Sequence, residues 1–286
     1  MRHMEGMFTG YRNLELFYQY WLPTKEPKAI IILVHGLRAH SGCYLKLNNY
    51  LLSKGYAIYS FDLRGHGKSE GIKGHVDNFS DYVHDLQAFI NRVRSEREGY
   101  DIFVIGISMG GTIALSYAWE NQNQLSGLVI AGAFLKPDID VSPLLIRTCT
   151  FLSLALPKIR IGSFDVSVMS KDKLVVNKYT KDPLYYKGKI TARLGSELLE
   201  ASKKLQPQIS SIKLPILIMH GTADRLANLE GSITLCESVG SIEKTLKLYD
   251  GAYHDIFNDL NNEQVFSDLN NWLCNHILGL PYSQAK

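Results

Sequence analysis

The chain has 286 residues, of which 45% are hydrophobic and 21% are charged, and its formal net charge is +3 at pH 7. This composition is typical of a globular protein with a large apolar core, built either as one large α/β domain or as two small ones. Because the net charge is small and the lysines and arginines are scattered, we expect no nucleic acid partner. No uninterrupted apolar run reaches the length of about 18 residues that a membrane span needs, and a basic-then-apolar leader is not indicated at the start.

The four cysteines are far apart, and none belongs to a C-x-x-C pair. Their spacing indicates neither a zinc site nor a disulfide framework, so reduced thiols in a cytoplasmic protein are the expectation. We expect no metal, and the chemistry inferred below requires no organic cofactor. The cysteines are Cys43, Cys149, Cys236 and Cys274.

Strands and helices are predicted to alternate along most of the chain, which is typical of βαβ units around a mainly parallel sheet. Short apolar runs indicate the strands, and runs with apolar residues on one face indicate the helices. The predicted strands are 7–22 (more than one strand), 29–34, 56–61, 101–106, 127–130, 214–219 and 245–249. The predicted helices are 45–53, 79–95, 111–119, 190–205, 230–239 and 263–277.

The alternation is interrupted between residues 133 and 183, a stretch that contains prolines and the apolar run 144–156. This run is too short to cross a bilayer and too apolar for a solvent-exposed loop. It fits either a buried helix hairpin or a cap whose apolar face covers a pocket. Its place after the strand 127–130 favours a cap at 133–185, inserted into a single domain of residues 1–286.

The pentapeptide Gly106-Ile107-Ser108-Met109-Gly110 lies between a predicted strand and a predicted helix. A serine in this context, with a glycine two residues to either side, fits a nucleophile elbow, in which a strained turn exposes the hydroxyl. Without chemical partners, the same residues would be only a glycine-rich turn from strand to helix.

A serine hydroxyl needs a neighbouring base, and the base needs an acid that orients it. Loops at the carboxyl ends of parallel strands share one crevice, so the candidates are Asp and His residues that follow strands. Asp224 follows the strand 214–219, and His254 follows the strand 245–249. The order Ser, Asp, His along the chain is the one expected for such a sheet. The sequence therefore predicts a catalytic triad of Ser108, Asp224 and His254.

Other acids and histidines compete for these roles. Asp250 and Asp255 flank the predicted base, but neighbours in sequence seldom face each other, so we interpret them as turn and helix-start residues. His220 ends a strand, but the glycine after it favours a structural turn. Asp62 and His66 also follow a strand, and we interpret them mainly as a hydrogen-bonded loop scaffold. No supporting pattern surrounds His40, His75, His84 or His276.

Acyl transfer also needs N–H donors for the developing oxyanion. The residue after the nucleophile, Met109, supplies one at the start of a helix, where the helix dipole favours negative charge. We expect the second from Leu37, in the loop after the strand 29–34, because Gly36 permits a close approach of the backbone. The alternative for this stretch is a tight turn without a catalytic role.

With these residues the sequence resembles α/β-hydrolases of the monoacylglycerol lipase and lysophospholipase group. The resemblance implies an α/β-hydrolase fold and a serine carboxylic-ester hydrolase that cleaves acyl esters, such as monoacylglycerols or short- to medium-chain esters, through an acyl-enzyme. It also implies an apolar cap that contacts a membrane or micelle surface transiently, so that the cytoplasmic protein would be peripheral to membranes. The segments that carry it, in the family's order, are 35–41 (HGLRAHS), 61–69 (FDLRGHGKS), 106–111 (GISMGG), 220–224 (HGTAD) and 253–257 (YHDIF).

The sequence departs from the family's pattern at informative positions. Ile107 replaces the histidine that is usual in the elbow, which leaves every catalytic role intact. Ala39 and Cys43 stand where monoacylglycerol lipases have a glutamate and an arginine that help to position the glycerol head group. Because discrimination of hydroxyl groups depends on placed polar partners, this loss weakens the prediction of glycerol recognition.

Other functions on the same fold are alternatives. A lysophospholipase or a thioesterase would use the same residues. Dehalogenases and epoxide hydrolases of this fold have an aspartate where Ser108 stands. A non-catalytic binding protein is a further alternative, but such relatives typically lack a triad residue, and this chain has all three.

Overall fold

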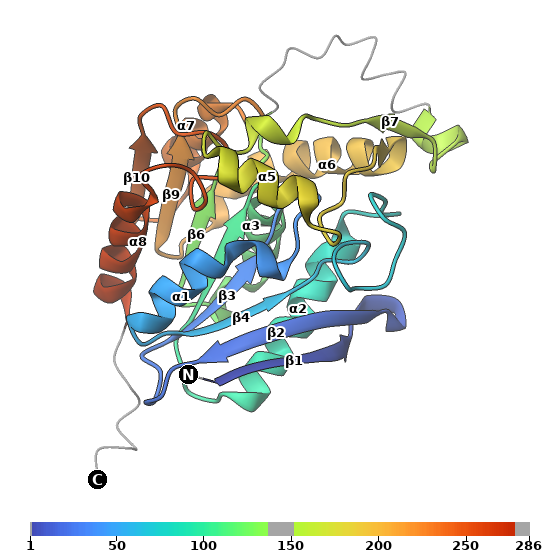
Figure 1. Cartoon of the computed structure of the whole chain (residues 1–286). Coiled ribbons are helices and arrows are strands. Elements are labelled where there is room, and N and C mark those ends of the chain that lie inside the picture. Colours follow the sequence, from blue (N-terminus) through green and yellow to red (C-terminus); the bar gives the residue numbers. More distant parts are fainter. Residues whose placement is uncertain (1, 137–151, 278–286) are drawn as a thin grey trace.

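The computed structural model describes residues 2–136 and 152–277. Its centre is an eight-stranded sheet in the order β1-β2-β4-β3-β5-β6-β9-β10 (Figure 1). The sheet is parallel from β4 to β10, whereas β2 is antiparallel to both of its neighbours. The strands are β1 (Arg2–Thr9), β2 (Glu15–Leu22), β3 (Ile30–Val34), β4 (Ala57–Phe61), β5 (Ile102–Ile107), β6 (Gly127–Ala131), β9 (Ile216–Gly221) and β10 (Lys244–Tyr249).

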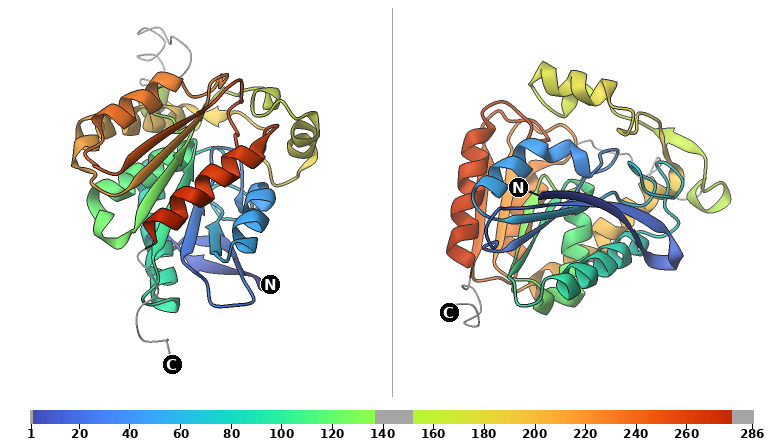
Figure 2. Two further views of the ribbon diagram at one scale, coloured as in Figure 1. Left: turned by 90° about the vertical axis from the view of Figure 1, so that its left-hand side faces the viewer. Right: turned by 60° about the horizontal axis from the view of Figure 1, so that its bottom comes forward.

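Helices cover both faces of the sheet (Figure 2). Five central strands are buried along their whole length, namely β3, β4, β5, β6 and β9. Because both of their faces are covered, their sequences are nearly continuous apolar runs. The cluster of core residues on one face includes α1 and α8, and the cluster on the other includes α2, α3, α6 and α7. These helices are α1 (Leu45–Ser53), α2 (Ser80–Glu96), α3 (Met109–Asn121), α6 (Ala192–Leu205), α7 (Leu229–Ser238) and α8 (Asn262–His276).

The predicted strands and helices of the sheet domain are confirmed, mostly to within two residues. The main difference is β1, which begins at Arg2, whereas the predicted strand region begins at residue 7. Most of β1 is exposed, so it lacks the alternation of apolar residues by which a strand is recognised. It is held by pairing with β2 along its whole length, from Arg2 opposite Leu22 to Thr9 opposite Glu15.

Residues 152–191, which we call the inserted segment, lie between β6 and β9 outside the main sheet (Figure 1). Within it, β7 (Arg160–Gly162) pairs antiparallel with β8 (Ile190–Thr191), and the 3-10 turn η4 (Val166–Val168) and α5 (Lys173–Lys181) lie between these strands. Part of the predicted apolar run, 144–151, lies outside the described residues. The cap boundaries 133–185 stay a prediction.

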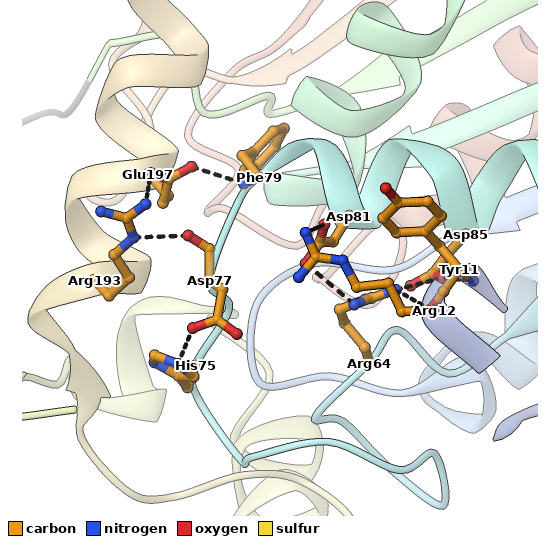
Figure 3. Close-up of polar contacts among 10 residues, drawn as sticks. All are labelled: Tyr11, Arg12, Arg64, His75, Asp77, Phe79, Asp81, Asp85, Arg193 and Glu197. Carbon is orange, nitrogen blue, oxygen red and sulfur yellow. Dashed lines mark hydrogen bonds and ion pairs between the residues drawn. The ribbon is translucent and has the colours of Figure 1, made fainter. Parts of the chain in front are cut away.

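A buried ion cluster holds the long connection between β4 and α2 in place (Figure 3). The guanidinium of Arg64 donates to both carboxylate oxygens of Asp85, at 2.6 and 2.7 Å, and to Asp81 at 3.3 Å. It also donates to the carbonyl oxygen of Tyr11, in the turn between β1 and β2, at 3.1 Å. On the other side, Arg193 of α6 donates to a carbonyl of the same connection at 2.7 Å. The connection is therefore tied to elements on both sides.

Within residues 2–136 and 152–277, no helix is long and apolar enough to cross a bilayer.

Candidate active site

Ser108 occupies the sharp turn between β5 and α3. Its backbone angles, φ 54° and ψ −122°, are ones that a residue with a side chain adopts only at a cost in free energy. Small neighbours make the turn sterically feasible. A Cβ at Gly106 would lie 2.6 Å from the carbonyl oxygen of Gly110, and a Cβ at Gly110 would collide with the carbonyl of Val34. This strained, tightly packed geometry is typical of a nucleophile elbow.

The loop after β3 lies against the elbow. A Cβ at Gly36 would be 3.0 Å from Cβ of Ser108, so a larger residue would be in tight contact with the serine. Leu37 is the next residue and is partly buried, and Met109 is the buried first residue of α3. The first N–H groups of a helix have no acceptor within the helix. Both predicted oxyanion donors therefore have their backbone close to Ser108.

The buried ring of His35 fixes the shape of this loop. His35 donates from Nδ1 to the carbonyl oxygen of Gly36 at 2.8 Å, and its Nε2 accepts the N–H of Leu63 at 2.9 Å. Complete burial lowers the pKa of His35 to about 3, so the ring is neutral and keeps one donor and one acceptor. Its two hydrogen bonds join the loop to the connection that follows β4.

Asp62 and His66 form the loop scaffold that the sequence indicates. The carboxylate of Asp62 accepts the backbone N–H groups of Ser41 and Lys68, at 2.7 and 2.8 Å. His66 donates from Nδ1 to the carbonyl oxygen of Arg64 at 3.0 Å, and burial lowers its pKa to about 3. These bonds stay within the two loops, which fits a structural role.

Asp224 and His254 are brought together across the ends of β9 and β10. Nδ1 of His254 donates to Oδ2 of Asp224 at 2.7 Å, and both side chains are buried. Gly132, just after β6, lies beside the pair, because a Cβ there would be 3.5 Å from both of these atoms. The adjacent Ala131 accepts the backbone N–H of Ser108 at 2.9 Å. The end of β6 thus lies between the Asp–His pair and the serine.

The ion pair controls the protonation of both groups. Burial alone would raise the pKa of Asp224, but the charge of His254 and hydrogen bonds from both His220 and His254 outweigh it, so this pKa is well below its usual range. Burial alone would lower the pKa of His254, but the charge and hydrogen bond of Asp224 raise it above 6.5. The arrangement stabilises a carboxylate beside an imidazolium, which is the state that a general base reaches after it accepts a proton.

His220 is the site residue that sequence reasoning missed. It is completely buried on β9, and its Nε2 lies 3.2 Å from Oδ2 of Asp224. The strand continues through His220 to Gly221, so the predicted turn begins later. The available signal was the spacing of His220 and Asp224, four residues apart after an apolar strand.

The two acids beside His254 differ from each other. Asp250 accepts a hydrogen bond from the Thr222 hydroxyl at 3.2 Å at an exposed turn, as expected. Asp255 is buried, and its carboxylate accepts the Tyr179 hydroxyl of α5 at 2.5 Å. Burial raises the pKa of Asp255. No helix begins at Asp255, because α8 starts at Asn262, so the interpretation of Asp255 as a helix-start residue is wrong. Its carboxylate instead joins the loop of His254 to the inserted segment.

The positions expected to hold a head-group clamp are apolar in their surroundings. Ala39 and Cys43 are both buried and belong to the core cluster that contains α1 and α8. Burial raises the pKa of the Cys43 thiol, so it stays protonated. Neither residue supplies a charged group to a substrate.

No group of three or more His, Cys, Asp or Glu side chains within the described residues is arranged to hold a metal ion. In the same part of the chain, Cys43, Cys236 and Cys274 are free thiols. Cys149 lies outside the described residues.

Known proteins similar to this chain over most of its length are named as hydrolases. A family model described as serine aminopeptidase, S33, matches residues 25–261. The human monoglyceride lipase is 33% identical over 261 residues, covering 90% of this chain and 86% of that protein. The monoacylglycerol lipase of Mycolicibacterium smegmatis is 29% identical over 273 residues, covering 96% of this chain and 98% of that protein.

A solved structure agrees with this at the level of the fold. The crystal structure of the Paleococcus ferrophilus monoacylglycerol lipase superposes with a TM-score of 0.83 at 29% identity, covering 92% of this chain and 99% of that one. The mostly parallel sheet flanked by helices is thus the α/β-hydrolase fold. The chain belongs to the serine aminopeptidase S33 family and is a serine hydrolase of the monoacylglycerol lipase type.

Proposed function

We propose that the protein hydrolyses monoacylglycerols and related single-chain carboxylic esters, with Ser108, Asp224 and His254 as its catalytic triad. The observation that carries this is the 2.7 Å hydrogen bond between His254 and Asp224. It lies at the carboxyl ends of the parallel strands, where Ser108 occupies a strained elbow. The substrate class is supported by the relatives named monoglyceride or monoacylglycerol lipase, which align over nearly the whole chain.

The proposed reaction has two steps. Ser108 Oγ attacks the ester carbonyl while Nε2 of His254 accepts its proton, and the N–H groups of Leu37 and Met109 stabilise the oxyanion. Collapse of the tetrahedral intermediate breaks the C–O bond to the alcohol, which leaves with the proton from His254. Water then attacks the acyl-enzyme, with His254 again as the base, and releases the fatty acid and Ser108.

Asp224 has the supporting role. It holds His254 in the tautomer whose Nε2 is free to accept, and it stabilises the imidazolium formed in each step. The raised pKa of His254 and the lowered pKa of Asp224 support this role. Side chains, backbone amides and water supply every group that these steps use.

The head group of the substrate is expected to be recognised weakly. Ala39 and Cys43 offer no charge to the glycerol hydroxyls, so discrimination in favour of glycerol esters rests on shape and apolar contact. Lysophospholipids and acyl thioesters are therefore alternative substrates that have to be compared with monoacylglycerols.

We also propose that residues 133–185 act as a cap and bring the cytoplasmic enzyme to the surface of a membrane or micelle. Two leucines of the inserted segment are strongly exposed, Leu154 at 72% and Leu174 at 78%. Around them the sequence is basic, since 152–191 holds seven lysines and one arginine against three aspartates. Exposed apolar side chains among lysines suit the surface of an anionic lipid membrane. The exposed basic residues are Lys158, Arg160, Lys171, Lys173, Lys178, Lys181, Lys187 and Lys189.

Substrate class is tested with one acyl chain on different leaving groups. We expect kcat/KM for a monoacylglycerol to exceed that for the methyl ester of the same acid by about ten-fold, because shape and apolar contact without a charged partner discriminate only modestly. Equal rates would indicate a generalist esterase. Faster cleavage of lysophosphatidylcholine or of an acyl thioester would establish one of the alternatives instead.

Surface contact is tested by sedimentation with vesicles. The protein should bind vesicles of phosphatidylcholine with phosphatidylserine more strongly than phosphatidylcholine alone, and less strongly as salt is raised. Leu154→Ser with Leu174→Ser should reduce binding. Ile242→Ser is the matched control, because Ile242 is 94% exposed outside the inserted segment. Equal binding by the double variant and the control would contradict the proposal.

A further inference from the structure

Arg38 joins the loop that carries Leu37 to the inserted segment. Its guanidinium donates to the carbonyl oxygen of Phe164 at 2.8 Å, and to those of Lys187 and Gly188, both at 3.1 Å. The guanidinium also lies over the ring of Phe164, 4.4 Å from its centroid. One side chain therefore contacts two separate stretches of the inserted segment, one before α5 and one after it.

The backbone of Arg38 takes part in the same contact. Its carbonyl oxygen accepts the N–H of Tyr186 at 2.9 Å. Arg38 has φ 72°, in the left-handed region that glycine adopts at much lower cost. The residue is only 2% exposed, so an arginine is buried here in a conformation that does not favour it. The contacts with the inserted segment compensate for the conformational strain and for the burial of the charge.

A second contact lies two residues further along the loop. Nε2 of His40 lies 2.9 Å from Oδ2 of Asp182. The other oxygen of Asp182 accepts the N–H of Leu184 at 2.8 Å, which fixes the start of the stretch that Arg38 contacts. The loop 36–41 and the stretch 182–188 are thus joined at both ends.

The Arg38 contact is a charge–dipole contact. The acceptors of the guanidinium are three backbone carbonyls, so no carboxylate has to be ionised for the hydrogen bonds to form. Burial lowers the pKa of Arg38, but a guanidinium stays protonated across the range in which enzymes work. At neutral pH the contact therefore depends on the position of the inserted segment and not on the protonation state of any group.

We propose that Arg38 is a positioning residue that locks the oxyanion loop to the inserted segment, so that the Leu37 N–H is correctly aimed only when the segment covers the site. The inference rests on the proposed role of Leu37 as an oxyanion donor. It assigns the covering segment a part in transition-state stabilisation as well as in access of substrate. Movement of stretch 182–188 away from the core would withdraw one oxyanion donor.

The test uses two substitutions of Arg38 in the full chain. Arg38→Met removes the donors but keeps an apolar stem, and Arg38→Gly removes them and also relieves the backbone strain, so at least the glycine variant should fold. In both we expect kcat for a p-nitrophenyl ester to fall about 10- to 100-fold, less than complete loss of an oxyanion donor would cause. KM should change by no more than about two-fold, because the interaction is made in the transition state.

Two further variants sharpen the readout. Arg38→Lys keeps the charge and can reach one carbonyl, so its kcat should lie between those of Arg38→Met and the parent. Arg97→Met is the matched control, because Arg97 donates to Tyr59 far from the loop, at 3.1 Å, and its loss should leave kcat unchanged. Hydrogen exchange in peptides 35–41 and 182–188 should rise together in Arg38→Gly.

The outcomes separate this inference from the proposed function. If folded Arg38→Gly keeps the parent kcat, or raises KM alone, the positioning role is wrong, whereas the proposed function stands as long as Ser108→Ala is inactive. If Ser108→Ala retains full activity, the proposed function fails first. A reduced kcat with unchanged KM in Arg38→Gly, together with an inactive Ser108→Ala, supports both.

Discussion

Nε2 of His220 lies 3.2 Å from the same carboxylate oxygen of Asp224 that accepts the His254 hydrogen bond. It also lies 3.1 Å from the carbonyl oxygen of Ala227, so this nitrogen faces two acceptors and carries a proton. Nδ1 of the ring then accepts the Ser232 hydroxyl at 2.7 Å. Asp224 is therefore held between two histidines, of which His220 lies on β9, the strand that precedes Asp224, and is completely buried.

Replacement of His220 should weaken the proposed acid. In His220→Leu, which removes the donor and keeps an apolar side chain, we expect kcat to fall about ten-fold, the effect of one lost hydrogen bond to a buried carboxylate. Ser232→Ala, which leaves His220 Nε2 in place, should reduce kcat much less. Steady-state kinetics of the two variants decides this, and equal losses would show that His220 acts through general packing.

Asp224→Asn should reduce kcat about 10⁴-fold while the fold persists, because an amide favours the wrong tautomer of His254. Asp250→Asn is the matched control: Asp250 is another acid in the loop after β10, and its side chain accepts a hydrogen bond from Thr222 at an exposed turn. Esterase assays should find it fully active. If Asp250→Asn is the inactive variant, the acid has been misassigned.

The pH profile follows from the protonation of His254. The ring must be neutral to accept a proton, and its pKa in the folded protein is raised above 6.5. Activity should therefore be lost as pH falls, with the midpoint of the acidic limb of kcat/KM above 6.5. In Asp224→Asn the main raising charge is gone, and burial is opposed only by the weaker effect of Asp255, so the midpoint of the residual activity should move to lower pH. If the midpoint of the acidic limb is the same in this variant as in the parent, the limb reports the titration of a group other than His254.

The ion cluster of Figure 3 predicts a contrast in stability between two arginines. Arg64→Met leaves Asp81 and Asp85 buried without their main partner, which should lower the free energy of unfolding by about 3–5 kcal/mol. Arg12 lies 3.6 Å from Asp81 but is 53% exposed, so Arg12→Met should cost less than about 1 kcal/mol. Urea unfolding measures both. Similar losses would mean that Arg64 acts mainly through its apolar stem.

The sheet domain could be predicted because its signals are local. Ile30–Val34 and the other central strands are apolar along their whole length, since helices bury both of their faces. The pairing of Asp224 with His254 could be predicted although 30 residues separate them, because the carboxyl ends of neighbouring parallel strands converge at one edge.

The remaining features depend on contacts that no local pattern encodes. Helix α5 buries only Val175 and Tyr179, and the partner of Tyr179, Asp255, is 76 residues away in the chain. The role of Arg38 depends on carbonyl groups at Phe164 and beyond, and a backbone carbonyl has no sequence signature. The His220 contact with Asp224 was not predicted, because Gly221 is typical of a turn although it is the last residue of β9.

The most direct measurement is to map the site of covalent labelling by a fluorophosphonate. The account predicts a single modified residue, Ser108, identified by mass spectrometry of the peptide that contains the elbow. It also predicts that Ser108→Ala is neither labelled nor active, while its far-ultraviolet circular dichroism matches that of the parent. Labelling at another residue, or ester hydrolysis retained by folded Ser108→Ala, would contradict the assignment of Ser108 as the nucleophile.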